Sequence, residues 1–339
     1  MKLPPLPVFF PDATRGLIKS LDTSDIESTK TEGLLVNTYH LYKDLGIKFI
    51  KEKGGIKKFM NWKGFVISDS GGFQVGSLIK MNPSAGHISN NGVLFKPQGE
   101  KQVMITPEKS IEFQMELGSD MVVVLDDFTD PKGTYEEAKV SVHRTINWAR
   151  RSKLEFERIC RLKHLTINNQ PLIIGVVQGG YYQDLRKYCI ENLLKIGFDG
   201  LGYGGWPMND NNTFDYESAK TIADNTPKNY LLYGLGVGKP TQITKLFKMR
   251  YKIFDCVLPT RDARHGRAYI SNTKTLDLIK GKIKDDDGPI SKTCDCLTCT
   301  RYSRSYINHL FKIKDFTAGR LVTIHNLRFY SMLIEKLRA

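Results

Sequence analysis

Three cysteines and one histidine near the C-terminal end of the sequence have the spacing of a metal site. Cys294, Cys296 and Cys299 form a Cys-x-Cys-x2-Cys motif, and His325 follows after a longer interval. Three thiolates and one imidazole make a closed tetrahedral set, the coordination that structural zinc prefers. We therefore predict one structural Zn²⁺ ion per chain, with no coordination position left open for catalysis.

A second group of polar residues follows directly on apolar runs of sequence. Any acidic residue in such a place could simply cap the next helix, but several together favour one shared site. Paired glycines close to them, such as Gly204 and Gly205, would let a ligand approach the backbone. Carboxylate and amide oxygens can accept hydrogen bonds from a purine, and separated carboxylates also suit chemistry at an anomeric carbon. The residues are Asp69, Asp126, Gln178 and Asp255.

Eight short apolar runs must position these residues, and most are separated by segments with helical periodicity. The helical segments are residues 107–118, 135–161 and 181–197. Apolar strands that alternate with helices are typical of parallel βαβ units. Eight such units closing on themselves form a (β/α)8 TIM barrel, an α/β fold whose active sites lie where the strands end. The apolar runs cover residues 8–10, 33–40, 64–72, 120–127, 172–180, 200–205, 230–238 and 252–260.

The composition limits the class of protein and its partners. The chain has 339 residues, with 50 Lys and Arg against 36 Asp and Glu, a formal net charge of +14. This excess favours a polyanionic partner, because each neutralised phosphate releases condensed counterions; a generally lysine-rich composition is the alternative. No apolar run approaches the ~20 residues of a membrane span, and the N-terminal sequence lacks signal-peptide features. Six cysteines, three of them clustered, fit a reducing compartment, so we predict a cytoplasmic protein without a membrane partner.

Several motifs in the sequence resemble, in the same order, those of the tRNA-guanine transglycosylases. The similarity runs from about Pro7 to the C-terminus and includes NTYHL at 37–41. One such motif alone would carry little weight, whereas this many in order, ending in the cysteine set, are specific. The other segments are SDSGGFQV (68–75), GVVQGGYYQDLR (175–186), FDGLGYGG (198–205), GLGVGKP (234–240), FDCVLPTRDARHGRAY (254–269) and CDCLTCTRYSRSYINHL (294–310).

The resemblance implies a base exchange without ATP or a redox cofactor. Guanine at the first anticodon position of tRNA is replaced by a 7-deazaguanine, in queuosine biosynthesis, through a covalent enzyme–RNA intermediate. Asp255 matches the nucleophile that attacks ribose C1′, a role suited to a carboxylate because the transition state resembles an oxocarbenium ion. Asp69 matches the acid/base residue that also hydrogen-bonds the base. An anticodon loop offers partly unstacked bases, so flipping one into a pocket costs only a few kcal/mol.

The resemblance also assigns residues to the base and to the RNA. Asn37 is expected to brace Asp69. Arg261 and Arg264, just beyond the nucleophile, match RNA-contacting arginines; solvated surface charges are the alternative. Family members commonly form homodimers, and we expect one here. The residues expected to bind or cover the base are Asp69, Phe73, Asp126, Gln178, Gly204, Gly205 and Leu235.

The sequence departs from the family pattern around the base. Phe128 stands where the family usually has a small cysteine, and Pro207 removes an amide donor from the loop that follows Gly205 and stiffens it. Phe128, Trp206 and Met208 make the pocket look crowded, which argues weakly against the bulky queuine. The sequence leaves the incoming base open among the aminomethyl compound, the nitrile precursor and queuine.

The sequence also leaves two alternative functions open. A related transglycosylase acting on DNA or another RNA would also fit, as would a non-catalytic RNA-binding subunit of the same fold, although such a subunit should have lost Asp255 or Asp69.

We expect a catalytic barrel over residues 1–280 and a zinc-binding subdomain with C-terminal helices over residues 281–339. The segment before Val8 is short for the family, so the element that closes the barrel bottom is expected to be reduced.

Overall fold

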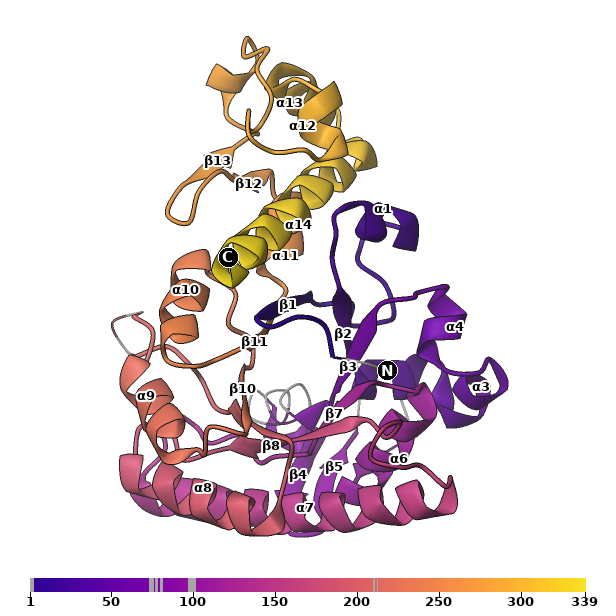
Figure 1. Ribbon diagram of the computed structural model, residues 1–339, viewed down its shortest axis with the longest axis vertical. Helices are drawn as coiled ribbons and strands as arrows, with labels where there is room; N and C mark the ends of the chain where they lie inside the picture. The colour runs from indigo at the N-terminus through magenta and orange to yellow at the C-terminus, as the bar shows by residue number, and fades with distance from the viewer. Residues whose placement is uncertain are drawn as a thin grey trace.

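The fold is built around an eight-stranded parallel sheet that curves into a barrel (Figure 1). The computed structural model describes residues 3–72, 76, 79, 82–96, 102–209, 211 and 213–339. The strand order is β1-β11-β10-β9-β8-β7-β3-β2, so each of the eight apolar runs contributes one strand and the predicted barrel is confirmed. The strands are β1 (Val8–Pro11), β2 (Gly33–Asn37), β3 (Phe65–Asp69), β7 (Met121–Val123), β8 (Leu172–Val177), β9 (Gly200–Tyr203), β10 (Leu231–Gly234) and β11 (Ile253–Cys256).

The barrel closes between β1 and β2 through a short bridge. Asp12, just after β1, pairs in parallel with Leu35. The amide of Ala13 donates to the carbonyl of Leu35 at 2.7 Å, and the amide of Asn37 donates to the carbonyl of Thr14 at 3.1 Å. The seam therefore lies at the carboxyl ends of these two strands, where a barrel carries its active site.

Alternation along β2 shows which side chains face the barrel interior. Leu34 and Val36 pack in a cluster with Phe113, a residue of the outer helix layer. Leu35 packs instead in the main core with Phe10 and other strand residues. Successive side chains of a strand point to opposite faces, so Leu35 and, two residues on, Asn37 face the interior.

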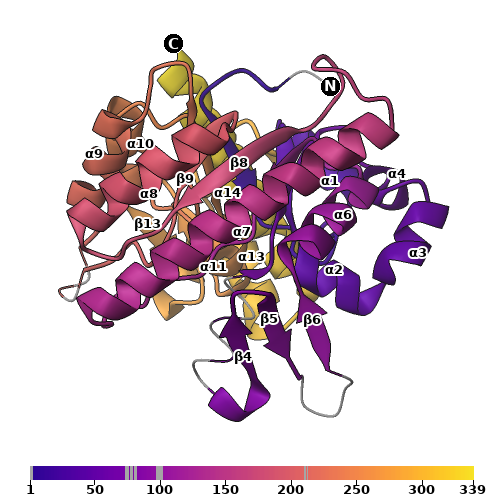
Figure 2. The ribbon, with the colours of Figure 1, turned by 90° about the horizontal axis from the view of Figure 1, so that it is seen from below.

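Helices cover the outside of the barrel, and three of them match the periodic segments of the sequence. Helices α7 and α8 lie across one side of the sheet (Figure 2). Helix α6 begins at an N-cap threonine with proline in its first turn, and α7 begins with a capping box. The outer helices include α1 (Thr23–Ser28), α2 (Thr38–Asp44), α3 (Gly46–Glu52), α4 (Ile56–Met60), α6 (Pro107–Leu117), α7 (Tyr135–Leu162), α8 (Gln183–Ile196), α9 (Tyr216–Asn225), α10 (Pro240–Lys248) and α11 (Leu258–Arg264).

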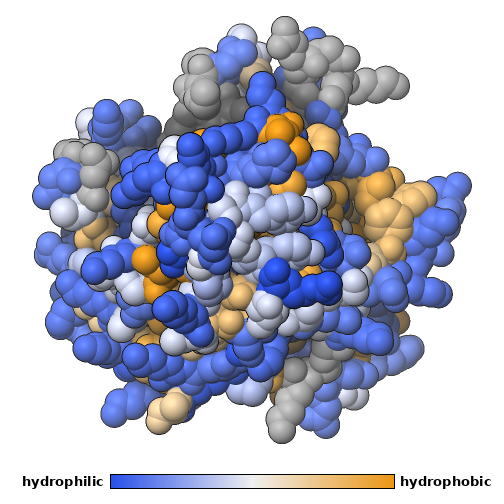
Figure 3. Space-filling model, turned by 90° about the horizontal axis from the view of Figure 1, so that it is seen from above, coloured by the Kyte–Doolittle hydropathy of each residue, from blue (hydrophilic) through white to orange (hydrophobic). Residues whose placement is uncertain are grey.

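Two small sheets and the C-terminal helices are added to the barrel. The antiparallel strands β4, β5 and β6 project from it (Figure 2). Beyond α11 the chain forms the β12–β13 hairpin and then the cysteine-rich segment. Seen from this end of the molecule, the surface is mostly hydrophilic (Figure 3). These elements are η1 (Pro83–Ala85), β4 (Gly86–Ser89), β5 (Gly92–Phe95), β6 (Val103–Ile105), β12 (Arg267–Tyr269), β13 (Thr275–Asp277), η2 (Gly281–Ile283), α12 (Leu297–Arg301), α13 (Arg304–Lys312) and α14 (Phe316–Arg338).

Helix α14 runs from the cysteine-rich segment back to the barrel (Figure 1). The Tyr330 hydroxyl donates to the carbonyl of Gly238 at 2.6 Å, and the Tyr330 ring lies 4.6 Å from that of Phe9 in β1. At the end of α14, Arg338 donates to the carbonyl of Pro7 and to Glu32, the residues before β1 and β2. Within the described ranges, no helix is long and apolar enough to cross a membrane.

Candidate active site and metal centre

The polar residues predicted to share one site lie at the carboxyl ends of the barrel strands. Asp69 ends β3 and Asp255 lies in β11, while Asp126 and Gln178 follow β7 and β8. Asp69 is close enough to raise the pKa of both Asp126 and Asp255 by charge repulsion. The barrel therefore brings these four residues to one mouth.

Asp255 is buried and held by two hydrogen-bond donors. The hydroxyl of Tyr233 donates to Asp255 Oδ1 at 2.8 Å, and the amide of Gly236 donates to the same oxygen at 2.9 Å. Burial raises the pKa of Asp255 to about 7, although both donors act against this shift. Both bonds are made to the same carboxylate oxygen, Oδ1.

Asp69 is braced from the neighbouring strand. Asn37 lies opposite Asp69 in the β2–β3 register, and its side-chain amide donates to Asp69 Oδ2 at 3.1 Å. The other end of the same amide, Asn37 Oδ1, accepts from the backbone amide of His40 at 3.1 Å and so caps helix α2. The contact expected between Asn37 and Asp69 is therefore present.

Asp126 and Gln178 form a second buried polar pair. The Gln178 side chain donates to Asp126 Oδ2 at 2.6 Å and accepts the amide of Thr129 at 3.2 Å. Burial, with repulsion from Asp69, raises the pKa of Asp126 to about 7. The adjacent Asp127 points elsewhere and forms an ion pair with Arg144 of α7.

Glycines bring the backbone after β9 against Gln178. A Cβ atom on Gly204 would lie 2.8 Å from Gln178 Nε2, and one on Gly205 would lie 3.4 Å from Gln178 Oε1. Gly205 also has a φ of +94°, which side chains rarely adopt. Leu235 packs on Gly202, where an added Cβ would lie 2.8 Å from its Cδ1. Trp206, in the same loop, is 49% exposed.

A buried arginine, which was not identified from the sequence, donates hydrogen bonds to the backbone of this loop. Arg186, in α8, is 1% exposed. Its guanidinium donates to the carbonyls of Gly180, Val177 and Gly204 at 2.8 to 3.2 Å. It also lies 4.8 Å from the ring centroid of Tyr203. Arg186 thereby fixes the two strand ends that carry Gln178 and Gly205.

The two arginines expected to contact RNA lie in α11, directly after the strand that carries Asp255. Arg261 is exposed, whereas Arg264 is half-buried and donates to the carbonyl of Thr260 at 3.0 Å. Charge interactions link Arg264 to Asp12 and to Arg261. The site therefore has a cationic rim beside its acidic mouth.

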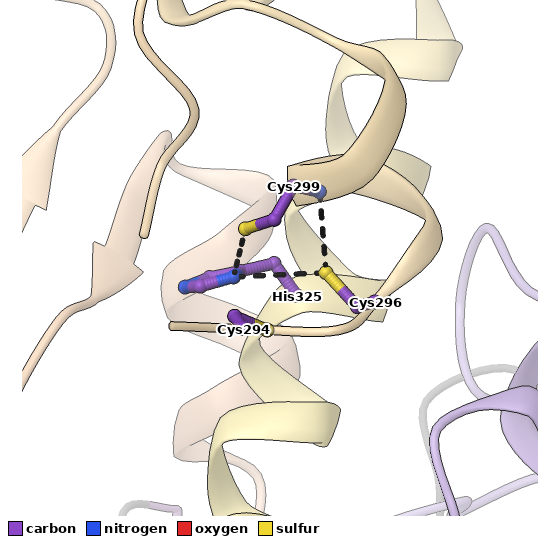
Figure 4. Close-up of side chains that lie close together, drawn as sticks. All are labelled: Cys294, Cys296, Cys299 and His325. Atoms are coloured by element: carbon purple, nitrogen blue, oxygen red, sulfur yellow. Dashed lines mark hydrogen bonds between the residues drawn. The ribbon is translucent and has the colours of Figure 1, made fainter. Parts of the chain in front are cut away.

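The predicted metal ligands form one cluster (Figure 4). The ligand atoms of Cys294, Cys296, Cys299 and His325 all lie within 4.8 Å of one another. His325 Nδ1 is 3.2 Å from Cys299 Sγ and 3.8 Å from Cys296 Sγ. Metal–ligand bonds of about 2.0 to 2.3 Å in a tetrahedron give similar separations. The cluster can hold a metal ion, as predicted.

The orientation of His325 also fits a ligand role. Its Nε2 lies 2.8 Å from the carbonyl oxygen of Tyr269, which can only accept a hydrogen bond. The proton therefore sits on Nε2, and the lone pair of Nδ1 faces the cysteines. Such a bond to the second ring nitrogen is how proteins usually orient a metal-bound histidine.

Comparison with known proteins identifies the family. A family profile described as queuine tRNA-ribosyltransferase matches residues 4–339. The protein of that name from Blochmanniella pennsylvanica is 40% identical over 333 residues, 98% of this chain and 87% of the relative. Those from Aliivibrio fischeri strain MJ11 and Psychrobacter cryohalolentis are 37% and 36% identical, each over 98% of this chain and 85% of the relative. The chain belongs to the queuine tRNA-ribosyltransferase family.

Membership confirms the family resemblance and the prediction of a pentosyltransferase of the tRNA-guanine transglycosylase type. Phe73, expected to stack on the base, lies outside the described residues. Three functional candidates were missed in the sequence. Tyr233 and Arg186 are described above, and the third is Asp12, at the β1–β2 seam, whose charge also raises the pKa of Asp255.

Proposed function

We propose that this chain exchanges guanine at the first anticodon position of tRNA for a 7-deazaguanine, through a covalent Asp255–ribose intermediate. The observation that carries the proposal is the pairing of a buried Asp255, with Oδ1 held by Tyr233 and Gly236, and a braced Asp69 in one barrel mouth. The family membership and the names of the relatives, which specify queuine and tRNA, support the same activity.

The proposed reaction uses the two carboxylates in two steps. Oδ2 of Asp255 attacks ribose C1′ as the bond from C1′ to guanine breaks, and the electron pair of that bond leaves with the base. Asp69 gives a proton to the departing guanine. It then takes a proton from the incoming base, whose nitrogen attacks C1′ and releases the Asp255 carboxylate. Negative charge beside C1′ stabilises the oxocarbenium-like transition state of both steps.

The base is recognised by the polar groups beside Asp69. Asp126 and Gln178 present oxygen acceptors to ring N–H and amino groups, and the backbone at Gly204 and Gly205 approaches the base closely. A neutral Asp126, favoured by its raised pKa, can also donate a hydrogen bond to a carbonyl oxygen of the base. Leu235 is proposed to cover the ring, and Phe73 to stack on it. Arg261 and Arg264 bind phosphates of the anticodon loop.

The metal, the assembly and the location are part of the same proposal. Cys294, Cys296, Cys299 and His325 would hold one Zn²⁺ ion, which would supply folding energy and no catalytic chemistry because four protein ligands leave no coordination position open. We place the boundary between the catalytic barrel and the zinc-binding subdomain at residues 280/281. The enzyme acts in the cytoplasm, where tRNA is modified, as a homodimer on one tRNA.

Guanine displacement tests the activity. An anticodon stem-loop with radiolabelled guanine at the first anticodon position is incubated with each candidate base in turn, and a DNA hairpin of the same sequence serves as the competing substrate. We expect release of label from the RNA with at least one 7-deazaguanine. Release from DNA alone would contradict a tRNA substrate, and no release from either would contradict the enzyme.

Trapping the intermediate tests the mechanism. Asp255→Asn and Asp255→Ala should give no covalent RNA adduct on a denaturing gel while RNA binding stays measurable. Asp262→Asn is a matched control, because Asp262 is a buried carboxylate of α11 that bonds Tyr269 at 2.7 Å instead of facing the mouth. An adduct of undiminished yield in Asp255→Ala would overturn the assignment of the nucleophile.

A further inference from the structure

Asp12 completes the ring of carboxylates around the barrel mouth. In the β1–β11 register, Phe10 lies opposite Asp255. Asp12 follows two residues later and pairs with Leu35 of β2. Phe9 packs against Tyr330 of the outer helix α14, and because side chains alternate along a strand, Phe10 and Asp12 point to the opposite, interior side, as does Leu35, the bridge partner of Asp12. The Asp12 carboxyl therefore faces the interior, one layer nearer the mouth than Asp255.

The two carboxylates are close enough to share one sugar. An offset of one strand and two residues separates the Cα atoms of Asp12 and Asp255 by ~8 Å. Burial is the main cause of the raised pKa of the Asp255 carboxyl and of the Tyr233 hydroxyl, and the charge of Asp12 adds to both shifts. A ribose ring bound to Asp255 thus lies within reach of Asp12.

The Asp12 side chain is held in place and remains accessible. The hydroxyl of Thr14 donates to Asp12 Oδ1 at 2.6 Å, and the amide of Thr14 also bonds the carboxyl. Burial raises the pKa of Asp12, while the Thr14 bonds and the nearby charges of His40 and Arg264 act against this shift. The residue is only half-buried. This is an oriented acceptor that a ligand in the mouth can contact.

Nucleoside stereochemistry gives this acceptor a partner. In a β-ribonucleoside the base lies on one face of the sugar and the 2′-hydroxyl on the other. A nucleophile that displaces the base attacks from the face opposite the base, which is the face that carries the 2′-hydroxyl. In the intermediate, Asp255 Oδ2 is bonded to C1′ and Oδ1 accepts from Tyr233 and Gly236. A second carboxylate on this face, that of Asp12, can accept from the 2′-hydroxyl.

We propose that Asp12 accepts a hydrogen bond from the 2′-hydroxyl of the nucleotide whose base is exchanged, and thereby selects ribose over deoxyribose. This inference rests on the proposed base exchange. A hydrogen bond to the hydroxyl next to the reacting carbon strengthens as positive charge develops there. The 2′-hydroxyl is also the group by which a protein tells RNA from DNA at a given nucleotide.

The test uses two RNA hairpins that differ in one oxygen. Both carry labelled guanine at the target position, with ribose in one and 2′-deoxyribose in the other, so all phosphate contacts are equal. The kcat/KM for guanine displacement is measured for wild type, Asp12→Ala and Asp12→Asn. Asp224→Ala, which removes one carboxylate from the exposed pair with Lys220 on α9, controls for net charge.

The ratio of the two kcat/KM values decides the proposal. We expect wild type and Asp224→Ala to prefer ribose by about 10-fold or more, the range for a hydrogen bond to a charged group. Asp12→Ala should bring the ratio to within about threefold. Asp12→Asn, which keeps the shape but is a weaker acceptor, should give an intermediate ratio and decides the matter if Asp12→Ala does not fold.

Two results would overturn the proposal. One is a wild type without ribose preference. The other is a folded Asp12 variant that keeps the wild-type ratio while losing activity equally on both hairpins, because Asp12 would then only organise the turn with Thr14. A wild type inactive on the ribose hairpin would instead contradict the base exchange itself, so the two failures are distinguishable.

Discussion

The side-chain nitrogen of Asn37 donates a hydrogen bond to Asp69 Oδ2 at 3.1 Å, and the oxygen of the same amide caps helix α2 by accepting from the backbone amide of His40. The two residues are also register partners in β2 and β3. The carboxyl proposed as the acid/base group is thus oriented by a strand neighbour whose own side chain is held at the start of a helix.

Substitutions of Asn37 can separate the hydrogen bond to Asp69 from the cap of helix α2. Asn37→Asp keeps the capping oxygen, because aspartate caps helices as well as asparagine, but it replaces the donor to Asp69 with a like charge. We expect kcat for guanine displacement to fall at least tenfold with little change in Tm. Asn37→Ala should lose a similar factor in kcat and also about 1 kcal/mol of stability from the lost cap. Equal kcat in wild type and Asn37→Asp would show that the contact does not matter for proton transfer.

Tyr233→Phe should shift the pH dependence of adduct formation. The Tyr233 hydroxyl stabilises the ionised form of Asp255, whose pKa burial has raised to about 7. Loss of this donor raises that pKa further, so the midpoint of the rising limb should move to higher pH, and the rate at pH 7 should fall about tenfold. Single-turnover adduct formation from pH 5 to 9 measures both effects. Tyr251→Phe is the control, since the buried Tyr251 hydroxyl bonds the carbonyl of Ala219. An unmoved midpoint would contradict the coupling.

Stability should decrease as pH rises from about 4 to 7. The pKa values of Asp255 and Asp126 are about 7 in the folded protein, raised by burial from an ordinary value near 3.8. Between these values the folded state binds more protons than the unfolded state, so the free energy of unfolding falls with pH and levels off above 7. Asp255→Asn should therefore raise Tm by a few degrees at pH 8 and not at pH 4. Asp224→Asn should show no such pH-dependent gain.

Arg261→Ala should weaken RNA binding without affecting chemistry. The exposed Arg261 lies in α11 beside the mouth. We expect KM for the stem-loop to rise about tenfold at unchanged kcat, and the slope of log Kd against log salt to fall by about 1. Arg158→Ala, which removes an exposed cation paired with Glu155 on α7, should leave both values near wild type. A lower kcat at unchanged KM would exclude a phosphate contact.

Metal removal should open the C-terminal segment before the barrel core. Chelation frees Cys294, Cys296 and Cys299 from α14, so hydrogen exchange should increase first over residues 290–303. Strands β7 and β8, which lie across the barrel, should exchange later. Cys299→Ser should lower metal content and Tm together, and the free Cys160→Ser should alter neither. Simultaneous loss of protection in β8 would show that the segment is not a separate stability unit.

The barrel could be predicted from the sequence because its strands are buried on both faces and therefore appear as continuous apolar runs. Asp69, Asp126 and Gln178 were recognisable because each ends such a run. Tyr233 was missed because a tyrosine within an apolar run looks like an ordinary core residue. Arg186 looks like a surface cation of an amphipathic helix, and only its three carbonyl contacts reveal its role.

Asp12 could not be found from the sequence for a different reason. It follows an apolar run of only three residues, and its importance depends on the register of β1 against β11 and β2. Register between strands more than 240 positions apart in the chain leaves no local pattern. The closure of the barrel, and not any motif, brings Asp12 close to Asp255.

The contacts of helix α14 bear on when the barrel can close during synthesis of the chain. It carries His325 at the metal centre and Arg338 against Pro7 and Glu32, so a helix that follows all eight barrel strands in the chain holds the segments before the first two strands. These contacts cannot form in a nascent chain until α14 has been synthesised. Newly synthesised molecules, with an open strand edge exposed until α14 docks, are therefore the ones most vulnerable to aggregation. A shortage of metal during synthesis should harm the yield of folded protein more than the same shortage harms molecules that are already folded.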